Sequence, residues 1–170
     1  MNADFLMIQK MRAGDQNSID RFVEKYYPAI YKYCRLQVKD SYTAEDLTQE
    51  TFIRFFESLE RYKHSGKTMN YLYVIASNAC RDYFRKTKEE PLDNPDEYVF
   101  QDSGAELRMD IQNAFESLPD EIREAAVLYF AGGLKQKDIS RITGAGLPLV
   151  KYRIRRAREL LSALLGKEDQ

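Results

Sequence analysis

Residues 136–165 read QKDISRITGAGLPLVKYRIRRARELLSALL. A short helical pattern covers Gln136 to Thr143, with Ile139 and Ile142 as its buried pair. The glycine-rich turn at 144–146 separates it from a long helical pattern that runs from about Leu147 to Leu165. Two helices joined by a glycine-containing turn are typical of a helix-turn-helix, and this stretch predicts one.

The second of these helices is strongly basic. Five cations fall within residues 151–158, and Lys151 and Arg155 share a helical face. Such a helix fits a DNA major groove, where its first residues read base edges and its arginines also bind phosphates. We predict that the apolar residues at positions 150, 154, 160, 161, 164 and 165 supply the packing contacts of this helix. The alternative for the cations is a solvated basic face on a packing helix. The candidate DNA contacts are Lys151, Tyr152, Arg153, Arg155, Arg156 and Arg158.

Upstream, the composition changes abruptly at residues 89–107. This segment holds seven acidic residues, two prolines and a glycine, but no lysine or arginine. Such a composition is typical of a solvated linker. We therefore predict an all-α chain with two small helical domains, 1–88 and 108–170, joined by an acidic linker at 89–107.

The N-terminal block reads as four helices, over about 4–13, 16–38, 43–62 and 70–88. Thr43, with Asp46 three positions later, is the expected N-cap of the third helix. Cys34 and Cys80 fall within apolar helical patterns, which predicts small buried side chains.

A second basic cluster mixes cations with aromatic residues between positions 63 and 86. Flat rings stack bases and cations follow the backbone of single-stranded nucleic acid. The alternative is that the aromatic side chains belong to the core. Some of them must be buried, and the candidates include Tyr73, Tyr83 and Phe84. The candidate contacts are Lys63, Lys67, Tyr71, Asn78, Arg81 and Arg85.

A third surface is the polar face of the 43–62 helix. Acidic residues there surround an isoleucine, an arrangement that suits a protein partner because charge gives orientation and the apolar side chain gives contact energy. The alternative is an ordinary solvated face. The candidate residues are Asp46, Gln49, Glu50 and Ile53.

Composition excludes several other classes of protein. The formal net charge is −1, which argues against a general nucleic-acid coat protein. No apolar run approaches the roughly 20 residues that a membrane span needs, and the start does not resemble a signal peptide, so we expect a cytoplasmic protein. With His64 as the only histidine and no CxxC pair, we expect no metal and no cofactor. The sequence also lacks a catalytic constellation, so we expect no enzyme activity.

Three blocks together resemble the extracytoplasmic-function group of the sigma-70 family. AEDLTQETFIRFFESLERYK (44–63) is similar to region 2.2, with Asp46 and Gln49 at its Asp-x-x-Gln core. YLYVIASNACRDYFRK (71–86) resembles regions 2.3–2.4, and residues 118–161 resemble region 4. The stretch from Asp4 to Arg35 is similar to region 2.1.

The resemblance implies an alternative RNA polymerase sigma factor and gives each surface a role. The face with Asp46 and Ile53 would dock on the coiled coil of the polymerase's largest subunit, and the flap of the second largest subunit would be a further partner of the chain. The 62–70 loop and Asn78 would capture a base flipped from the melted −10 element, and the helix at 148–160 would read the −35 element. Family members are commonly held inactive by an anti-sigma factor, and we expect one here.

Two positions depart from the family pattern. Tyr71 stands where tryptophan is usual, which keeps an aromatic body. Gly146-Leu147-Pro148-Leu149 replaces the usual Pro-x-Gly-Thr, and Leu149 removes a hydroxyl often available to a phosphate. The −35 contacts of residues 147–149 are therefore expected to differ from those of relatives.

Two other functions stay open on sequence: a helix-turn-helix regulator that binds duplex DNA without polymerase, and an interaction adaptor that has lost DNA binding. The segment around Asn78 favours the sigma factor over the first, and the arginine-rich helix argues against the second. We also expect the acidic linker to mask the DNA-binding surfaces, so that neutralising Glu89, Glu90, Asp93, Asp96 and Glu97 raises the affinity of the free chain for DNA.

Overall fold

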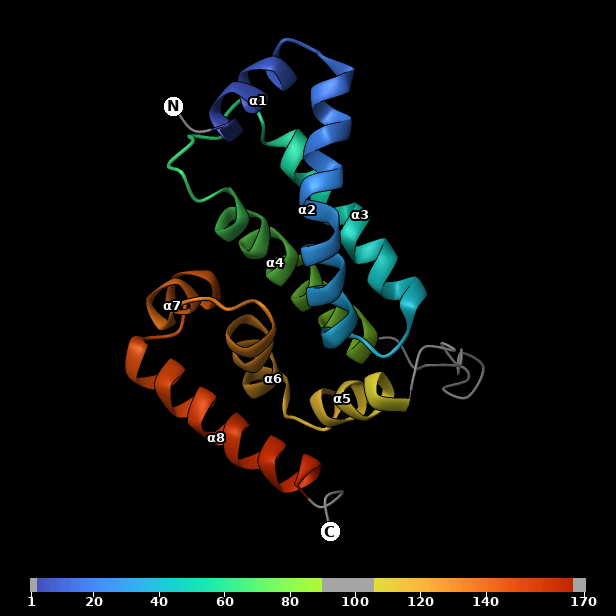
Figure 1. The fold of residues 1–170 in the computed structure, drawn as a ribbon, viewed down its shortest axis with the longest axis vertical. Coiled ribbons are helices and arrows are strands. Elements are labelled where there is room, and N and C mark those ends of the chain that lie inside the picture. Colours follow the sequence, from blue (N-terminus) through green and yellow to red (C-terminus); the bar gives the residue numbers. More distant parts are fainter. Residues whose placement is uncertain (1–2, 90–105, 167–170) are drawn as a thin grey trace.

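The computed structural model describes residues 3–89 and 106–166, which are helical throughout apart from turns and loops, with no strand among them. The first unit comprises α1 (Ala3–Arg12), α2 (Gln16–Gln37), α3 (Ser41–Glu57) and α4 (Thr68–Glu89). The second comprises α5 (Glu106–Glu116), α6 (Asp120–Ala126), the π-helical turn η1 (Val127–Ala131), α7 (Gln136–Thr143) and α8 (Leu147–Leu165) (Figure 1). The prediction of an all-α fold is confirmed.

The core of the first unit lies where α3 packs against α2 and α4. Phe22 of α2 stacks on Phe55 of α3 with 4.7 Å between ring centroids, and both side chains are fully buried. Replacing such a ring by alanine costs about 3–5 kcal/mol of stability, because the burial is lost and a cavity remains. The predicted burial of Cys34 and Cys80 is also confirmed.

The start of α3 differs from the prediction that Thr43 is the N-cap. The helix begins at Ser41, and Asp40 is the N-cap, its carboxylate accepting from the Thr43 backbone N–H at 2.8 Å. The Thr43 hydroxyl donates to the same carboxylate at 2.8 Å. The residue three positions before Thr43 therefore satisfies one of the free N–H groups of the first turn.

The second unit contains the predicted helix-turn-helix. Gly144 ends α7 at φ 77°, a left-handed conformation that glycine adopts without strain, and Pro148 lies in the first turn of α8. Ile139 and Ile142 of α7 are buried as predicted, and α8 buries Val150, Ile154, Ala157 and Leu161. Leu164 and Leu165 are exposed, so the prediction that they pack is wrong for this structure.

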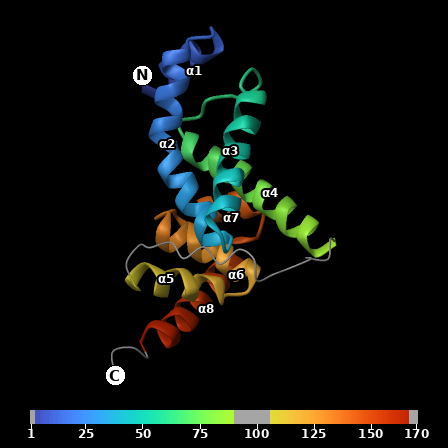
Figure 2. The same ribbon diagram turned by 90° about the vertical axis from the view of Figure 1, so that its right-hand side faces the viewer.

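The two units pack on each other. Figures 1 and 2 show α5, α6 and α7 against the side of α2 and α4, while α8 lies on the outer side of the second unit. Tyr33 and Tyr73 of the first unit are buried near this contact, with 5.5 Å between ring centroids. The prediction that the acidic linker masks the DNA-binding surfaces concerns side chains outside the described residues. The contact between the two units is formed by other residues.

Candidate nucleic-acid interface

The basic face of α8 is open to solvent. Lys151, Tyr152 and Arg155 are exposed, and Arg156 and Arg158 are exposed further along the helix. Arg153 is the exception, because its side chain is only 14% exposed and its Nη2 donates to Oε2 of Glu121 on α6 at 3.1 Å. Arg153 therefore faces α6, and the structure does not place it with the other predicted contacts.

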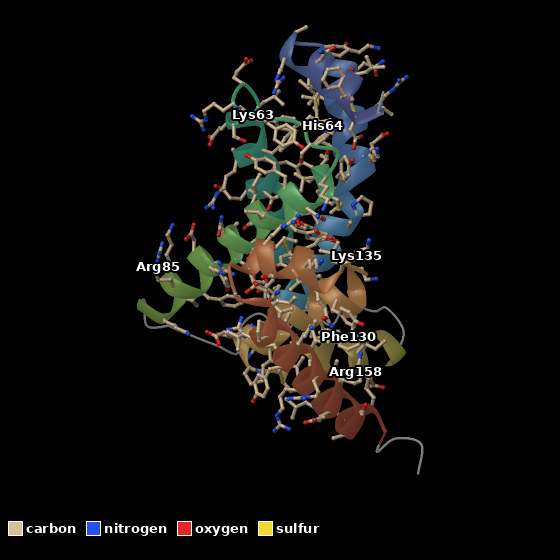
Figure 3. The ribbon with its side chains drawn as sticks, turned by 90° about the vertical axis from the view of Figure 1, so that its left-hand side faces the viewer. Lys63, His64, Arg85, Phe130, Lys135 and Arg158 are labelled. Carbon is tan, nitrogen blue, oxygen red and sulfur yellow. The ribbon has the colours of Figure 1, made fainter. Side chains whose placement is uncertain are left out.

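Arg158 lies beside an aromatic ring that the sequence analysis did not select. Its guanidinium carbon is 5.6 Å from the centroid of the Phe130 ring, and Phe130 is 41% exposed (Figure 3). Phe130 belongs to η1, and π-helical turns occur frequently at functional sites. Helical periodicity could not single out Phe130, because the wider turn of η1 changes the register of the side chains.

The segment after α3 carries two of the predicted strand contacts. Lys63 (Figure 3) and Lys67 are exposed there, and Gly66 has a φ of 85°. Tyr71 at the start of α4 is half-buried, with its ring 4.7 Å from that of Tyr62 and its hydroxyl 3.0 Å from the Ser58 hydroxyl. Tyr73 is buried, so for this residue the core alternative is right.

Asn78, Arg81 and Arg85 lie on one exposed face of α4, as their spacing of three and four residues requires. Arg85 donates to Asp82 at 3.2 Å within the same helix. The structure therefore brings these three predicted contacts together.

Two of the predicted strand-binding cations are paired with the second unit. Nη2 of Arg81 lies 3.1 and 3.2 Å from the two carboxylate oxygens of Glu124 and donates to the Thr143 carbonyl at 2.9 Å. Nζ of Lys67 is 3.1 Å from Asp138 of α7. In the free chain both cations are therefore paired with acidic residues of the second unit.

The contact between the units combines buried apolar side chains with polar pairs. Arg123 of α6 is buried, donating to Gln37 of α2 at 3.3 Å, and its guanidinium carbon lies 5.4 Å from the Phe84 ring centroid. A cavity of about 350 Å³ remains nearby, lined in part by Ser77 and Glu124. Incompletely filled domain contacts allow relative motion more readily than large, fully packed apolar ones.

The predicted partner surface lies on α3. Asp46 and Gln49 are exposed and Ile53 is 51% exposed, so an apolar side chain stands in solvent among polar ones. Glu50 is half-buried and pairs with Arg54 at 3.0 Å. Hydrogen bonding to Glu50 raises the pKa of Arg54.

Within residues 3–89 and 106–166, no group of three or more His, Cys, Asp or Glu side chains is placed to hold a metal ion. In the same ranges, each helix is too short or too polar to cross a bilayer.

Comparison with known proteins identifies the family. Residues 22–90 match Sigma-70 region 2, and residues 108–161 match Sigma-70, region 4. The ECF RNA polymerase sigma factor SigM of Bacillus subtilis is 33% identical over 158 residues, covering 88% of this chain and 96% of SigM. This chain belongs to the extracytoplasmic-function group of the sigma-70 family. Its function is that of an alternative RNA polymerase sigma factor, and regions 2 and 4 correspond to the first and second helical units.

Solved structures show the same fold. CnrH, in complex with the cytosolic domain of CnrY, aligns with a TM-score of 0.75 and 22% identity, covering 98% of this chain and 99% of CnrH. The sigma factor RpoE from Bartonella quintana, in complex with the anti-sigma factor NepR, aligns with a TM-score of 0.72 and 23% identity, covering 86% of this chain and 96% of RpoE.

Proposed function

We propose that three separate surfaces of this sigma factor divide the work of promoter recognition. The observation that carries the proposal is that one chain presents a basic helix-turn-helix on α7 and α8, a basic face on α4, and an exposed isoleucine among acidic residues on α3. A regulator that binds only duplex DNA needs the first of these surfaces and not the other two.

The α3 surface would bind core polymerase. Asp46, Gln49 and Glu50 would orient the chain on the coiled coil of the largest subunit, and Ile53 would supply apolar contact. The flap of the second largest subunit would hold the second unit, and so fix the distance between the two DNA-binding surfaces.

The loop after α3 and the exposed face of α4 would bind the −10 element. Lys63 and Lys67 would bind the backbone of the melted strand, Arg81 and Arg85 would extend that track, and Asn78 and Tyr71 would contact the extruded base. Extracting a base costs a few kcal/mol of stacking, which contacts in a pocket can offset. Because Lys67 and Arg81 pair with the second unit in the free chain, core binding would have to separate the units.

The exposed face of α8 would read the −35 element in the major groove. Lys151, Tyr152 and Arg155 stand nearest its N-terminus, where recognition helices contact base edges. Arg156 and Arg158 would bind phosphates, and Arg153 would join them only after leaving Glu121. The unusual start at Gly146–Leu149 would alter the contacts of that first turn.

Residues 1–88 and 108–170 would act as the two functional domains, with 89–107 as the linker between them. The chain would work in the cytoplasm as a non-catalytic subunit without cofactor. An anti-sigma factor would hold it inactive, as the complexes of the structural relatives suggest.

Run-off transcription with core polymerase on a promoter library tests the proposal. Core with this chain should initiate from a subset of promoters that share −10 and −35 sequences. The proposal fails if core with the chain initiates no better than core alone while the chain still binds duplex DNA, and the chain would then be a helix-turn-helix regulator. Ile53→Asp should abolish core binding and leave duplex binding intact. Leu6→Asp, at an exposed apolar position of α1, is the control and should leave both unchanged.

A further inference from the structure

Helix α1 lies over the segment that joins α3 to α4, residues 58–67, here named the promoter loop (Figure 1). The match to Sigma-70 region 2 begins at residue 22, so α1 lies before the matched residues. Its contacts with the promoter loop are nevertheless specific.

Arg12, the last residue of α1, holds the beginning of the loop. Its Nε donates to the Leu59 carbonyl at 3.0 Å, and its Nη2 donates to the Tyr62 carbonyl. Both carbonyls follow the C-terminus of α3, where backbone oxygens lack helical partners and a cation is favourable. One guanidinium therefore links two turns of the loop across about 50 residues of sequence.

Phe5 contacts the middle of the loop, and Asp4 fixes α1 on α2. The Phe5 ring lies 6.2 Å from the His64 ring, centroid to centroid, in the middle of the promoter loop. Figure 3 shows His64 and Lys63 at the end of the molecule where α1 lies. Asp4 is buried and accepts from Lys25 at 2.6 Å and from Tyr26, which anchors α1 to α2.

We propose that α1 is a clamp on the promoter loop and that Arg12 is a positioning residue for base capture at the −10 element. The proposal rests on the proposed function, in which this loop binds the melted strand. Arg12 does not contact DNA in this role. It holds the loop backbone in one conformation, so that Lys63, Lys67 and the neighbouring aromatic residues meet the strand without first being ordered, and preorganisation of this kind increases affinity.

The test uses holoenzyme and fork DNA made from a promoter that the library selects. Abasic sites are placed one at a time along the single-stranded −10 region, and the affinity of each fork is compared with that of the intact fork. The wild-type chain should show one position where base removal weakens binding about 10- to 100-fold, the range expected for losing a stacked base. Arg12→Ala should lower that ratio about tenfold, because a hydrogen bond from a charged donor is worth roughly that factor.

Two variants control for charge and folding. Lys10→Ala removes an exposed cation from the same helix and should leave the ratio unchanged. Arg12→Lys keeps the charge but has a single nitrogen for two carbonyls, so its ratio should fall between those of wild type and Arg12→Ala. If circular dichroism shows that Arg12→Ala does not fold, the ratio of Arg12→Lys alone tests the proposal.

The outcomes separate the clamp from the proposed function. The clamp is overturned if Arg12→Ala keeps the wild-type ratio of intact-fork to abasic-fork affinity, even where both affinities fall equally. Base capture would still stand. The absence of any base-dependent position in the wild-type chain overturns both.

Discussion

Glu124 of α6 lies in the contact between regions 2 and 4, so its substitution tests whether that contact restrains the free chain. Its carboxylate accepts from Ser77 and lies 3.1 and 3.2 Å from Nη2 of Arg81. Glu124→Gln preserves the size of the side chain and one acceptor oxygen for Ser77, while it removes the charge that faces Arg81. The substitution should therefore weaken the contact without creating a cavity.

The exposure of the two side chains sets the magnitude. Glu124 is 13% exposed and Arg81 is 46% exposed, and an ion pair with one solvated partner contributes about 0.2–1 kcal/mol. Arg81 also keeps its bond to the Thr143 carbonyl, so about 1 kcal/mol is an upper bound. That free energy corresponds to roughly a fivefold shift toward the open chain. Apparent affinity for the −10 strand should rise by up to the same factor, because only the open chain binds.

Fluorescence anisotropy with a labelled −10 oligonucleotide would measure this shift in the free chain. Glu24→Gln on α2 removes the same charge from an exposed position and corrects for general attraction to DNA. The difference between the two variants should shrink near 0.15 M salt, where the Debye length is about 8 Å. If Glu124→Gln binds no more tightly than Glu24→Gln at low salt, the contact between the units does not limit DNA binding by the free chain.

Three further predictions concern stability and reactivity. Asp40→Ala should lower the free energy of unfolding by about 1 kcal/mol in urea denaturation, because α3 loses its N-cap, whereas Lys39→Ala next to it should have little effect. Burial raises the pKa of Asp4, but hydrogen bonds from Lys25 and Tyr26 outweigh it and hold that pKa below 3.8. The stability that Asp4 contributes is thus present above about pH 4 and lost as pH falls through its folded-state pKa. In Asp4→Asn the free energy of unfolding should therefore fall less steeply below pH 4, and the same fall as in the wild-type chain would contradict this. Hydrogen bonding to Cys34 and burial hold the pKa of Cys80 well above 9.0, so a thiol reagent should modify it at pH 8 only on unfolding, and rapid labelling of the native chain would count against its burial.

Much of the fold could be predicted from local sequence. The bounds of α7 and α8 follow from Ile139, Ile142, Gly144 and Pro148, because apolar spacing, a left-handed glycine and a first-turn proline act within a few residues. The start of α3 was predicted wrongly at Thr43, because the residue that caps a helix depends on which backbone N–H groups its side chain reaches, and here Asp40 reaches that of Thr43. The exposure of Leu164 and Leu165 also escaped prediction, because periodicity gives a face of the helix and not what covers it.

The candidate site, like the fold, could be predicted only in part from the sequence. Composition and periodicity were enough to predict which side chains carry the charged and polar surfaces: the cations of α8, the α3 face around Ile53, and Lys67, Arg81 and Asn78. How these side chains are engaged in the free chain depends on the packing of the helices. This packing turned Arg153 toward Glu121, buried Tyr73, joined Arg12 to the promoter loop, and paired Arg81 with Glu124 and Lys67 with Asp138. The physical reason is that propensity and periodicity act over a few residues, whereas these pairs join positions 32 to 71 residues apart and form only when whole helices pack.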